Sequence, residues 1–133
     1  MNLSPLQLEK LRNLGVSLIY LFGSYAEGKE GPLSDIDLAV LFHQESVPGE
    51  ENIGGAYNAL YDILTDLFPR KNVDIIFLQK TNLELRFDVI THGKILYESS
   101  REDRLSFEEK TMLLYADFRP LLKLFNQTLL HRA

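Results

Sequence analysis

Hydrophobic positions along the chain follow two spacings, one typical of helices and one typical of strands. Helical spacing predicts helices over residues 5–14, 56–68 and 82–92, and from Ser99 to near the end of the chain. Short apolar runs predict strands at Val16–Phe22, Asp35–Phe42 and Val73–Leu78, with a short edge strand at Ile95–Tyr97. Helices that alternate with strands indicate an α+β or α/β fold.

Several boundaries of these elements carry their own signals. Ser4–Gln7 has Ser at the N-cap, Pro at the first helical position and a Gln that can reach back, which predicts a capping box. Gly15 is placed to end that helix. Thr81–Glu84 predicts a second capping box for the later helix. The polar stretch Gln44–Gly55 contains Pro48 and several glycines, so we expect a loop there.

The C-terminal segment is helical in pattern but contains Pro120, which is expected to kink or break the helix. Its apolar residues cover more than one stripe of the helix surface. A helix that is apolar on two sides usually has two surfaces to bury against. One would be the sheet of the same chain, and a partner chain is a candidate for the other.

Composition and charge narrow the class of protein. With 133 residues, 45% hydrophobic and 25% charged, the chain is expected to fold as one globular domain over residues 1–133. It has no cysteine, which excludes a disulfide scaffold, a zinc–thiolate site and a thiol nucleophile. Neither a signal peptide nor a membrane span is expected, so we predict a cytoplasmic protein. A net charge of −5 argues against direct nucleic-acid binding.

Asp35 and Asp37 form the first candidate for chemistry. Residues two apart in a strand point to the same face, so both carboxylates are expected to project together. Their repulsion would be relieved by a hard divalent cation such as Mg²⁺, which binds one or two carboxylates together with substrate phosphates. Taken alone, an Asp-x-Asp pattern is more often part of a solvated turn.

Gly23-Ser24 and Asp74 extend this candidate. The Gly-Ser pair directly follows a predicted strand, and the next residues, Tyr25–Glu27, are compatible with the start of a helix. Backbone N–H groups and a hydroxyl at such a point suit a phosphate, although a simple strand-end turn is the commoner role of Gly-Ser. Asp74 is the only charge in an apolar strand pattern, which is costly against a core unless the carboxylate is paired or metal-bound. A strand-start residue that faces water is the alternative.

These residues together resemble a known family. Gly23-Ser24, ten intervening residues and then Asp35-Ile36-Asp37 match the Gly-Ser-x₁₀-Asp-x-Asp motif of the DNA polymerase β-like nucleotidyltransferases. The similarity extends from about Leu18 to Tyr97 and includes the strand that closes the fold. The small size is similar to that of minimal nucleotidyltransferases, including the antitoxins encoded beside HEPN-domain toxin ribonucleases.

The resemblance implies a fold, a reaction and a site. The fold would be a small mixed β-sheet packed against helices, like the polymerase β palm, with residues 1–98 as the catalytic core and 99–133 as a C-terminal helical segment. Asp35 and Asp37 would hold two Mg²⁺ ions, and Asp74 would ligate the catalytic ion and help deprotonate the acceptor hydroxyl. Gly23 and Ser24 would hold the β- and γ-phosphates of ATP.

The same resemblance implies an acceptor and leaves alternatives open. Antitoxins of this kind transfer AMP from ATP to a tyrosine of the HEPN toxin encoded by a neighbouring gene, and this AMPylation blocks its RNase activity. One alternative is a nucleotidyltransferase with a small-molecule acceptor, such as an antibiotic. A second is an antitoxin that neutralises its partner by binding without catalysis. Lys29, Lys80, Arg86 and Lys94 could neutralise a triphosphate, though each is more often a solvated cation.

Overall fold

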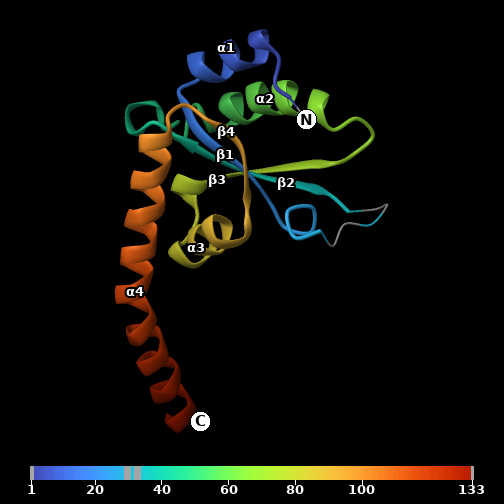
Figure 1. Ribbon diagram of the computed structural model, residues 1–133. Helices are drawn as coiled ribbons and strands as arrows, with labels where there is room; N and C mark the ends of the chain where they lie inside the picture. Colours follow the sequence, from blue (N-terminus) through green and yellow to red (C-terminus); the bar gives the residue numbers. More distant parts are fainter. Residues whose placement is uncertain (1, 29–30, 32–33, 133) are drawn as a thin grey trace.

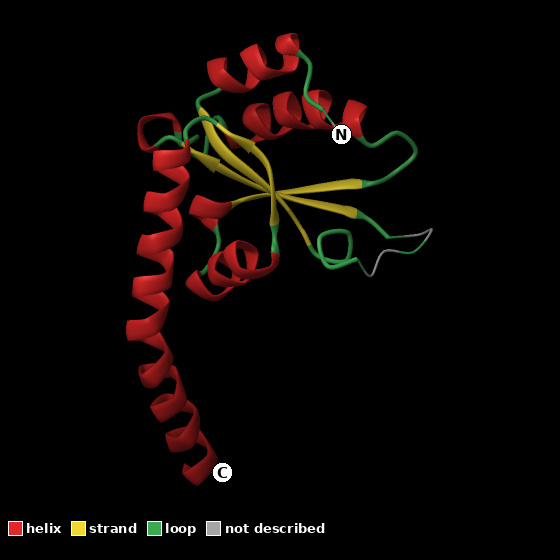
Figure 2. Ribbon diagram, in the orientation of Figure 1, coloured by secondary structure: helices red, strands yellow, loops and turns green. Residues whose placement is uncertain are grey.

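The computed structural model describes residues 2–28, 31 and 34–132, with side chains described as far as Thr128. Figures 1 and 2 show one sheet with helices on both of its faces and a long C-terminal helix at one side. Its strands are β1 (Val16–Phe22), β2 (Ile36–Phe42), β3 (Val73–Phe77) and β4 (Lys94–Glu98). Its α-helices are α1 (Pro5–Asn13), α2 (Ile53–Leu64), α3 (Leu83–His92) and α4 (Arg101–Arg132), and short 3₁₀ turns are η1 (Gln44–Ser46), η2 (Thr65–Leu67) and η3 (Leu78–Lys80).

The sheet is mixed, with the strand order β3-β2-β1-β4. β1 pairs antiparallel with both β2 and β4, whereas β2 and β3 are parallel. Helices α1 and α2 lie on one face, and α3 and α4 lie on the other (Figure 1). The predicted mixed sheet packed against helices, with a helical C-terminal segment, is confirmed.

The two faces of the sheet are set by the period of two along each strand. In β2, Ile36 and Leu38 are buried in the apolar cluster beneath α1 and α2. Ala39 belongs to a second buried cluster, which includes Tyr20 and Val89 and lies on the α3 side. Asp37 has the same parity as Ala39, so its carboxylate lies on the α3 face of the sheet.

Helix α1 begins and ends where the sequence indicates. The hydroxyl of Ser4 accepts a hydrogen bond from the backbone N–H of Gln7, and the Gln7 side chain accepts one from the N–H of Ser4, which confirms the capping box. Gly15 has φ of +76°, a left-handed conformation that suits glycine after a helix.

Two other boundary predictions are wrong. Asn82 caps α3, because its side chain accepts from the N–H of Leu85 at 2.8 Å, whereas the Thr81 hydroxyl donates backwards to the carbonyl of Leu78. The predicted loop ends earlier than expected, since α2 begins at Ile53. Ile53 packs against the buried core, and this burial offsets the cost of the glycines that follow it in the helix.

Helix α4 continues through Pro120, so the break that this residue suggested does not occur. Figure 1 shows the helix axis changing direction in its C-terminal half. Pro120 is exposed, which leaves the unpaired carbonyl of the preceding turn accessible to water.

Several contacts hold the first half of α4 against the body, among them an ion pair of Arg104 with Glu98 of β4. The Tyr20 hydroxyl of β1 donates to Glu108 at 2.9 Å. The Phe87 ring of α3 stacks on Tyr115 with centroids 3.9 Å apart. Within the described residues, no helix combines the length and the apolar character needed to cross a bilayer.

Candidate active site

Two of the predicted acidic residues meet across neighbouring strands. Asp37 of β2 and Asp74 of β3 are register partners in the parallel pair. The last residue of β1, Phe22, is the partner of Asp37 on the other side. Three features therefore lie together at one end of the strands, on the face of the sheet that also carries α3: Asp37, Asp74 and the end of β1.

The acidic pair has an electrostatic signature. Partial burial raises the pKa of Asp37, and the neighbouring carboxylates of Asp74 and then Asp35 raise it further. Asp35 lies just before β2 and is exposed, and Asp74 is also exposed. Asp74 thus faces water and not a core, so the burial cost considered from the sequence does not arise.

Gly23 brings the backbone directly against this pair. Its φ is +76°, and a Cβ atom at this position would overlap the carboxylate of Asp37. Only glycine fits the turn without strain, because other residues are disfavoured at such a φ and would also displace Asp37. Ser24, the next residue, is half-buried in the same turn.

The residues after Ser24 do not begin a helix. Residues 23–28 form consecutive turns, in which the N–H of Glu27 donates to the carbonyl of Gly23 at 3.2 Å. The side chain of Tyr25 explains the difference, because it packs against the buried core and has the Lys71 ammonium 5.5 Å from its ring centre. Tyr25 thus anchors the turn, and the helix that would have offered N–H groups to a phosphate is absent.

The loop before β2 and one candidate cation also lie at this end of the sheet, since Lys94, the first residue of β4, is the register partner of Leu21. The Ser34 hydroxyl accepts from the N–H of Gly31 at 2.8 Å, which shapes the backbone that leads into Asp35. Lys29 falls outside the described residues. Arg86 lines a groove at the opposite end of β2, where Leu41 and Phe42 lie.

The donor set fits a hard cation only in part. Carboxylate oxygens are the ligands that Mg²⁺ prefers. Burial and the repulsion from neighbouring carboxylates raise the pKa of Asp37, and a bound cation would relieve this repulsion. In the described part of the chain, however, no three acidic or histidine side chains already form a group that could hold a metal ion. Phosphate oxygens of a bound nucleotide are the further ligands that such a site would need.

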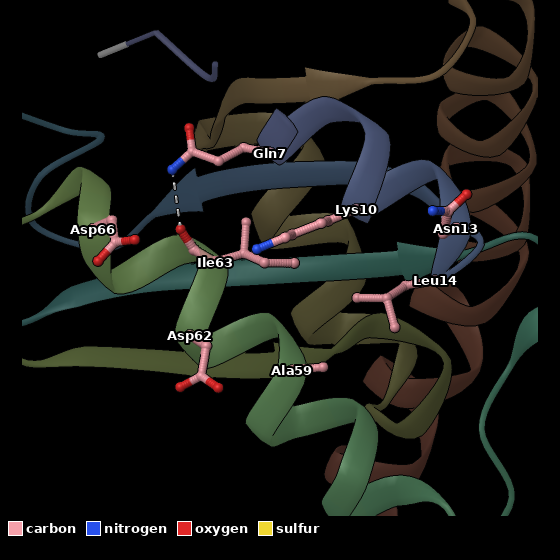
Figure 3. Close-up of a pocket in the computed structure, with 8 residues that line it drawn as sticks. All are labelled: Gln7, Lys10, Asn13, Leu14, Ala59, Asp62, Ile63 and Asp66. Carbon is pink, nitrogen blue, oxygen red and sulfur yellow. Dashed lines mark hydrogen bonds between the residues drawn. The ribbon is translucent and has the colours of Figure 1, made fainter. Parts of the chain in front are cut away.

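A groove between α1 and α2 is not this site. It has a volume of about 410 Å³ and is lined by Lys10, Asp62 and Asp66, among others. Figure 3 shows Lys10 on α1, Asp62 on α2 and Asp66 in η2, with the Gln7 amide donating to the carbonyl of Ile63 at 3.4 Å. The groove lies on the face of the sheet opposite to Asp37, so it does not share the acidic pair.

A known family matches both the motif and the fold around it. The family described as polymerase beta, nucleotidyltransferase, matches residues 8–102, which contain the Gly-Ser turn and all three aspartates. The chain belongs to this family.

Individual relatives add detail. The protein adenylyltransferase MntA of Shewanella oneidensis is 34% identical over 102 residues, which cover 75% of this chain and 66% of MntA. The chain thus matches slightly less than two thirds of that relative. A chain from a toxin–antitoxin structure with AMP-PNP has a TM-score of 0.70 at 27% identity, with 92% of this chain and 94% of that chain covered. A chain from the complex of the tri-AMPylated Shewanella oneidensis HEPN toxin with its MNT antitoxin has a TM-score of 0.64 at 27% identity, with 92% of each chain covered.

Proposed function

We propose that this chain is an Mg²⁺-dependent protein adenylyltransferase that acts as an antitoxin. It would transfer AMP from ATP to a tyrosine of a HEPN ribonuclease toxin encoded by a neighbouring gene. The observation that carries the proposal is the register pairing of Asp37 with Asp74 beside the left-handed turn at Gly23. This arrangement places carboxylates that can bind a metal ion beside a turn whose backbone can come close to a phosphate. A nucleoside triphosphate requires both features.

The aspartates have separate roles in this proposal. Asp35 and Asp37 would hold two Mg²⁺ ions, and Asp74 would be a further ligand. When bound, the ions supply charge stabilisation to the phosphates and to the attacking and leaving oxygens. The turn at Gly23 and Ser24 receives the β- and γ-phosphates through its backbone N–H groups and the serine hydroxyl.

The reaction is a direct displacement. The phenolic oxygen of the acceptor tyrosine attacks the α-phosphorus, and the bond from that phosphorus to the bridging oxygen breaks as pyrophosphate leaves. Asp74 accepts the phenolic proton, since it is exposed to an incoming substrate and lies opposite Asp37 in the register. The chain contributes positioning and charge and forms no covalent intermediate.

Two observations support a protein acceptor. The related structures are toxin–antitoxin complexes, one with AMP-PNP and one with a tri-AMPylated toxin. In addition, α4 presents large apolar side chains to solvent, including Leu121, Leu124 and Phe125, each at least 60% exposed. Exposed apolar side chains gathered on one helix are typical of a surface that another protein covers.

The test is a transfer assay with the HEPN protein encoded beside this gene. The purified chain is incubated with that protein, Mg²⁺ and α-labelled ATP, and the label on the partner is followed by gel and by intact mass. We expect Asp35→Asn, Asp37→Asn and Asp74→Asn each to slow transfer by about a thousandfold, since metal-held charge supplies several kcal/mol of the barrier reduction. Asp62→Asn, an exposed acid on α2, is the matched control and should transfer at the wild-type rate.

The assay separates this proposal from its alternatives. Full activity of all three variants would refute the roles given to the aspartates. Partner binding without label, unchanged by Asp35→Asn, would indicate a non-catalytic antitoxin. Label on an aminoglycoside and none on the partner would indicate a small-molecule acceptor.

A further inference from the structure

A second groove lies between the C-terminal end of β2 and the helices α3 and α4. It has a volume of about 350 Å³ and apolar walls that include Leu41, Phe107 and Leu114. The charged side chains among its lining residues are both cations, Arg86 of α3 and Lys110 of α4. This is notable in a chain whose net charge is −5.

Arg86 has an unmet hydrogen-bonding need in this groove. Its Nε is buried and makes no hydrogen bond among the described residues. Two of the neighbouring polar side chains are committed elsewhere, because Gln79 bonds both the N–H and the carbonyl of Phe42, and the Thr111 hydroxyl donates to the carbonyl of Phe107. A buried N–H donor without an acceptor is costly, so this N–H calls for an explanation. A ligand that accepts its hydrogen bond would be one.

The groove is continuous with the exposed apolar surface of α4. Lys110 and Leu114 also line a shallower hollow that contains Leu113. Leu114 and Leu113 are 46% and 61% exposed. The hollow also carries the acidic residues Glu109 and Asp117, so a negative group of a bound segment is matched by the two cations of the groove, whereas the leucines of the hollow suit the apolar neighbours of that group.

The position of the groove relative to the aspartates suits a docking role. Leu41 has the same parity as Asp37 in β2, so both lie on the α3 face of the sheet. They are four positions apart along the strand, which corresponds to about 13 Å. A protein bound in the groove would thus lie beside the acidic pair without covering it.

We propose that this groove docks the HEPN toxin by receiving a carboxylate side chain of the toxin between Arg86 and Lys110, with apolar neighbours against Leu41 and Leu114. The inference rests on the proposed function, since it identifies the surface that recognises the acceptor protein. A carboxylate matches the planar donor fork of arginine, and arginine is enriched at protein interfaces. A nucleic acid would need a longer run of cations than these two.

The test measures affinity for the toxin apart from chemistry. Arg86→Met keeps an apolar stem and removes the charge, and Lys110→Glu reverses a charge on an exposed side chain. We expect each to raise the Kd for the HEPN protein encoded beside the gene, Arg86→Met by about thirtyfold, as loss of a buried charged partner does. The KM for the toxin should rise in parallel, whereas kcat and the Kd for ATP should stay at wild-type values.

A matched control and further readouts keep the outcomes distinct. Lys10→Glu reverses an exposed charge on α1, on the opposite face of the sheet, and should leave toxin affinity unchanged, and thermal melting shows that each variant is folded. Unchanged toxin affinity in both groove variants, beside normal AMP transfer by the wild type, would overturn the docking proposal alone. Tight toxin binding by the wild type without AMP transfer would overturn the proposed function alone. If light scattering shows a dimer that the groove variants dissociate while toxin affinity is unchanged, the occupant is a second copy of this chain and the proposal is wrong.

Discussion

Replacement of Asp37 by asparagine should stabilise the protein while it abolishes transfer. In the absence of a cation, the charge on Asp37 is unfavourable because it is partly buried and lies opposite Asp74. Asparagine has nearly the same shape and carries no charge. A residue that serves a structural role would show the opposite pattern, since removal of its interactions would lower stability.

The magnitude follows from the register. Partners on adjacent strands lie about 4.8 Å apart. Two unit charges at about 5 Å repel by about 0.8 kcal/mol in water and by about 3 kcal/mol at an effective dielectric constant of 20. Asp74 is exposed, so screening by solvent places the interaction near the lower value, and we expect a gain of about 1 kcal/mol. For 133 residues this corresponds to an increase in Tm of about 3–4 °C.

The pH dependence gives the prediction a sign. The folded-state pKa of Asp37 is raised above its usual value of 3.8, so the folded state binds more protons than the unfolded state over the range between the two values. Stability conferred by the protonated group is therefore lost as pH rises through that range. The difference between wild type and Asp37→Asn should be absent well below pH 3.8 and complete at neutral pH.

The assay is urea denaturation in EDTA at several pH values, followed by circular dichroism. Asp62→Asn serves as the control, because it removes an exposed carboxylate on α2 and should change stability by less than about 0.5 kcal/mol. If Asp37→Asn is equal to or less stable than the wild type at neutral pH, the repulsion inferred from the register does not exist.

Two further substitutions test the turn and the helix anchor. Gly23→Ala should lower the free energy of unfolding by about 1–2 kcal/mol, because alanine is strained at φ of +76° and its Cβ would overlap Asp37. The substitution should also weaken ATP binding in calorimetry, and an ATP affinity equal to that of the wild type would contradict the role of this turn. Tyr20→Phe removes the hydrogen bond to Glu108 and should lower the free energy of unfolding, measured by urea denaturation, by about 1.5–3 kcal/mol. ATP affinity should not change. An unchanged free energy of unfolding would show that this bond does not hold α4 to the sheet.

The strands could be predicted from the sequence because their burial leaves a local pattern. Val16–Phe22 matches the observed β1, β2 and β3 each differ from their predictions by one residue at one end, and β4 is longer than predicted by one residue at each end. The central strands β1 and β2 are apolar because they lie between two layers of helices. The start of α2 was missed because glycines usually indicate a loop, and the contact of Ile53 with the core that outweighs them is not visible locally.

The candidate site, like the fold, could be predicted from the sequence only in part. The spacing of Gly23-Ser24 from Asp35 and Asp37 is local and could be recognised directly. The pairing of Asp37 with Asp74 depends on the register between β2 and β3, which no local pattern specifies. The groove at Arg86 was missed for the same reason, because Leu41, Arg86 and Lys110 are far apart in the sequence and meet only in the folded chain.

The position of the carboxylates reflects how the α3 face of the sheet is covered. Ala39 is fully buried beneath α3, Asp37 two residues earlier is half-buried, and Asp74 beside it is exposed. Cover decreases along the strand because α3 ends at Gly93, where the chain turns directly into β4. Carboxylates placed further inside would be too costly to ionise, and carboxylates placed on an open surface would be screened by water. The aspartates therefore lie beside the end of α3, where they remain ionisable, interact electrostatically with one another and are accessible to a nucleotide.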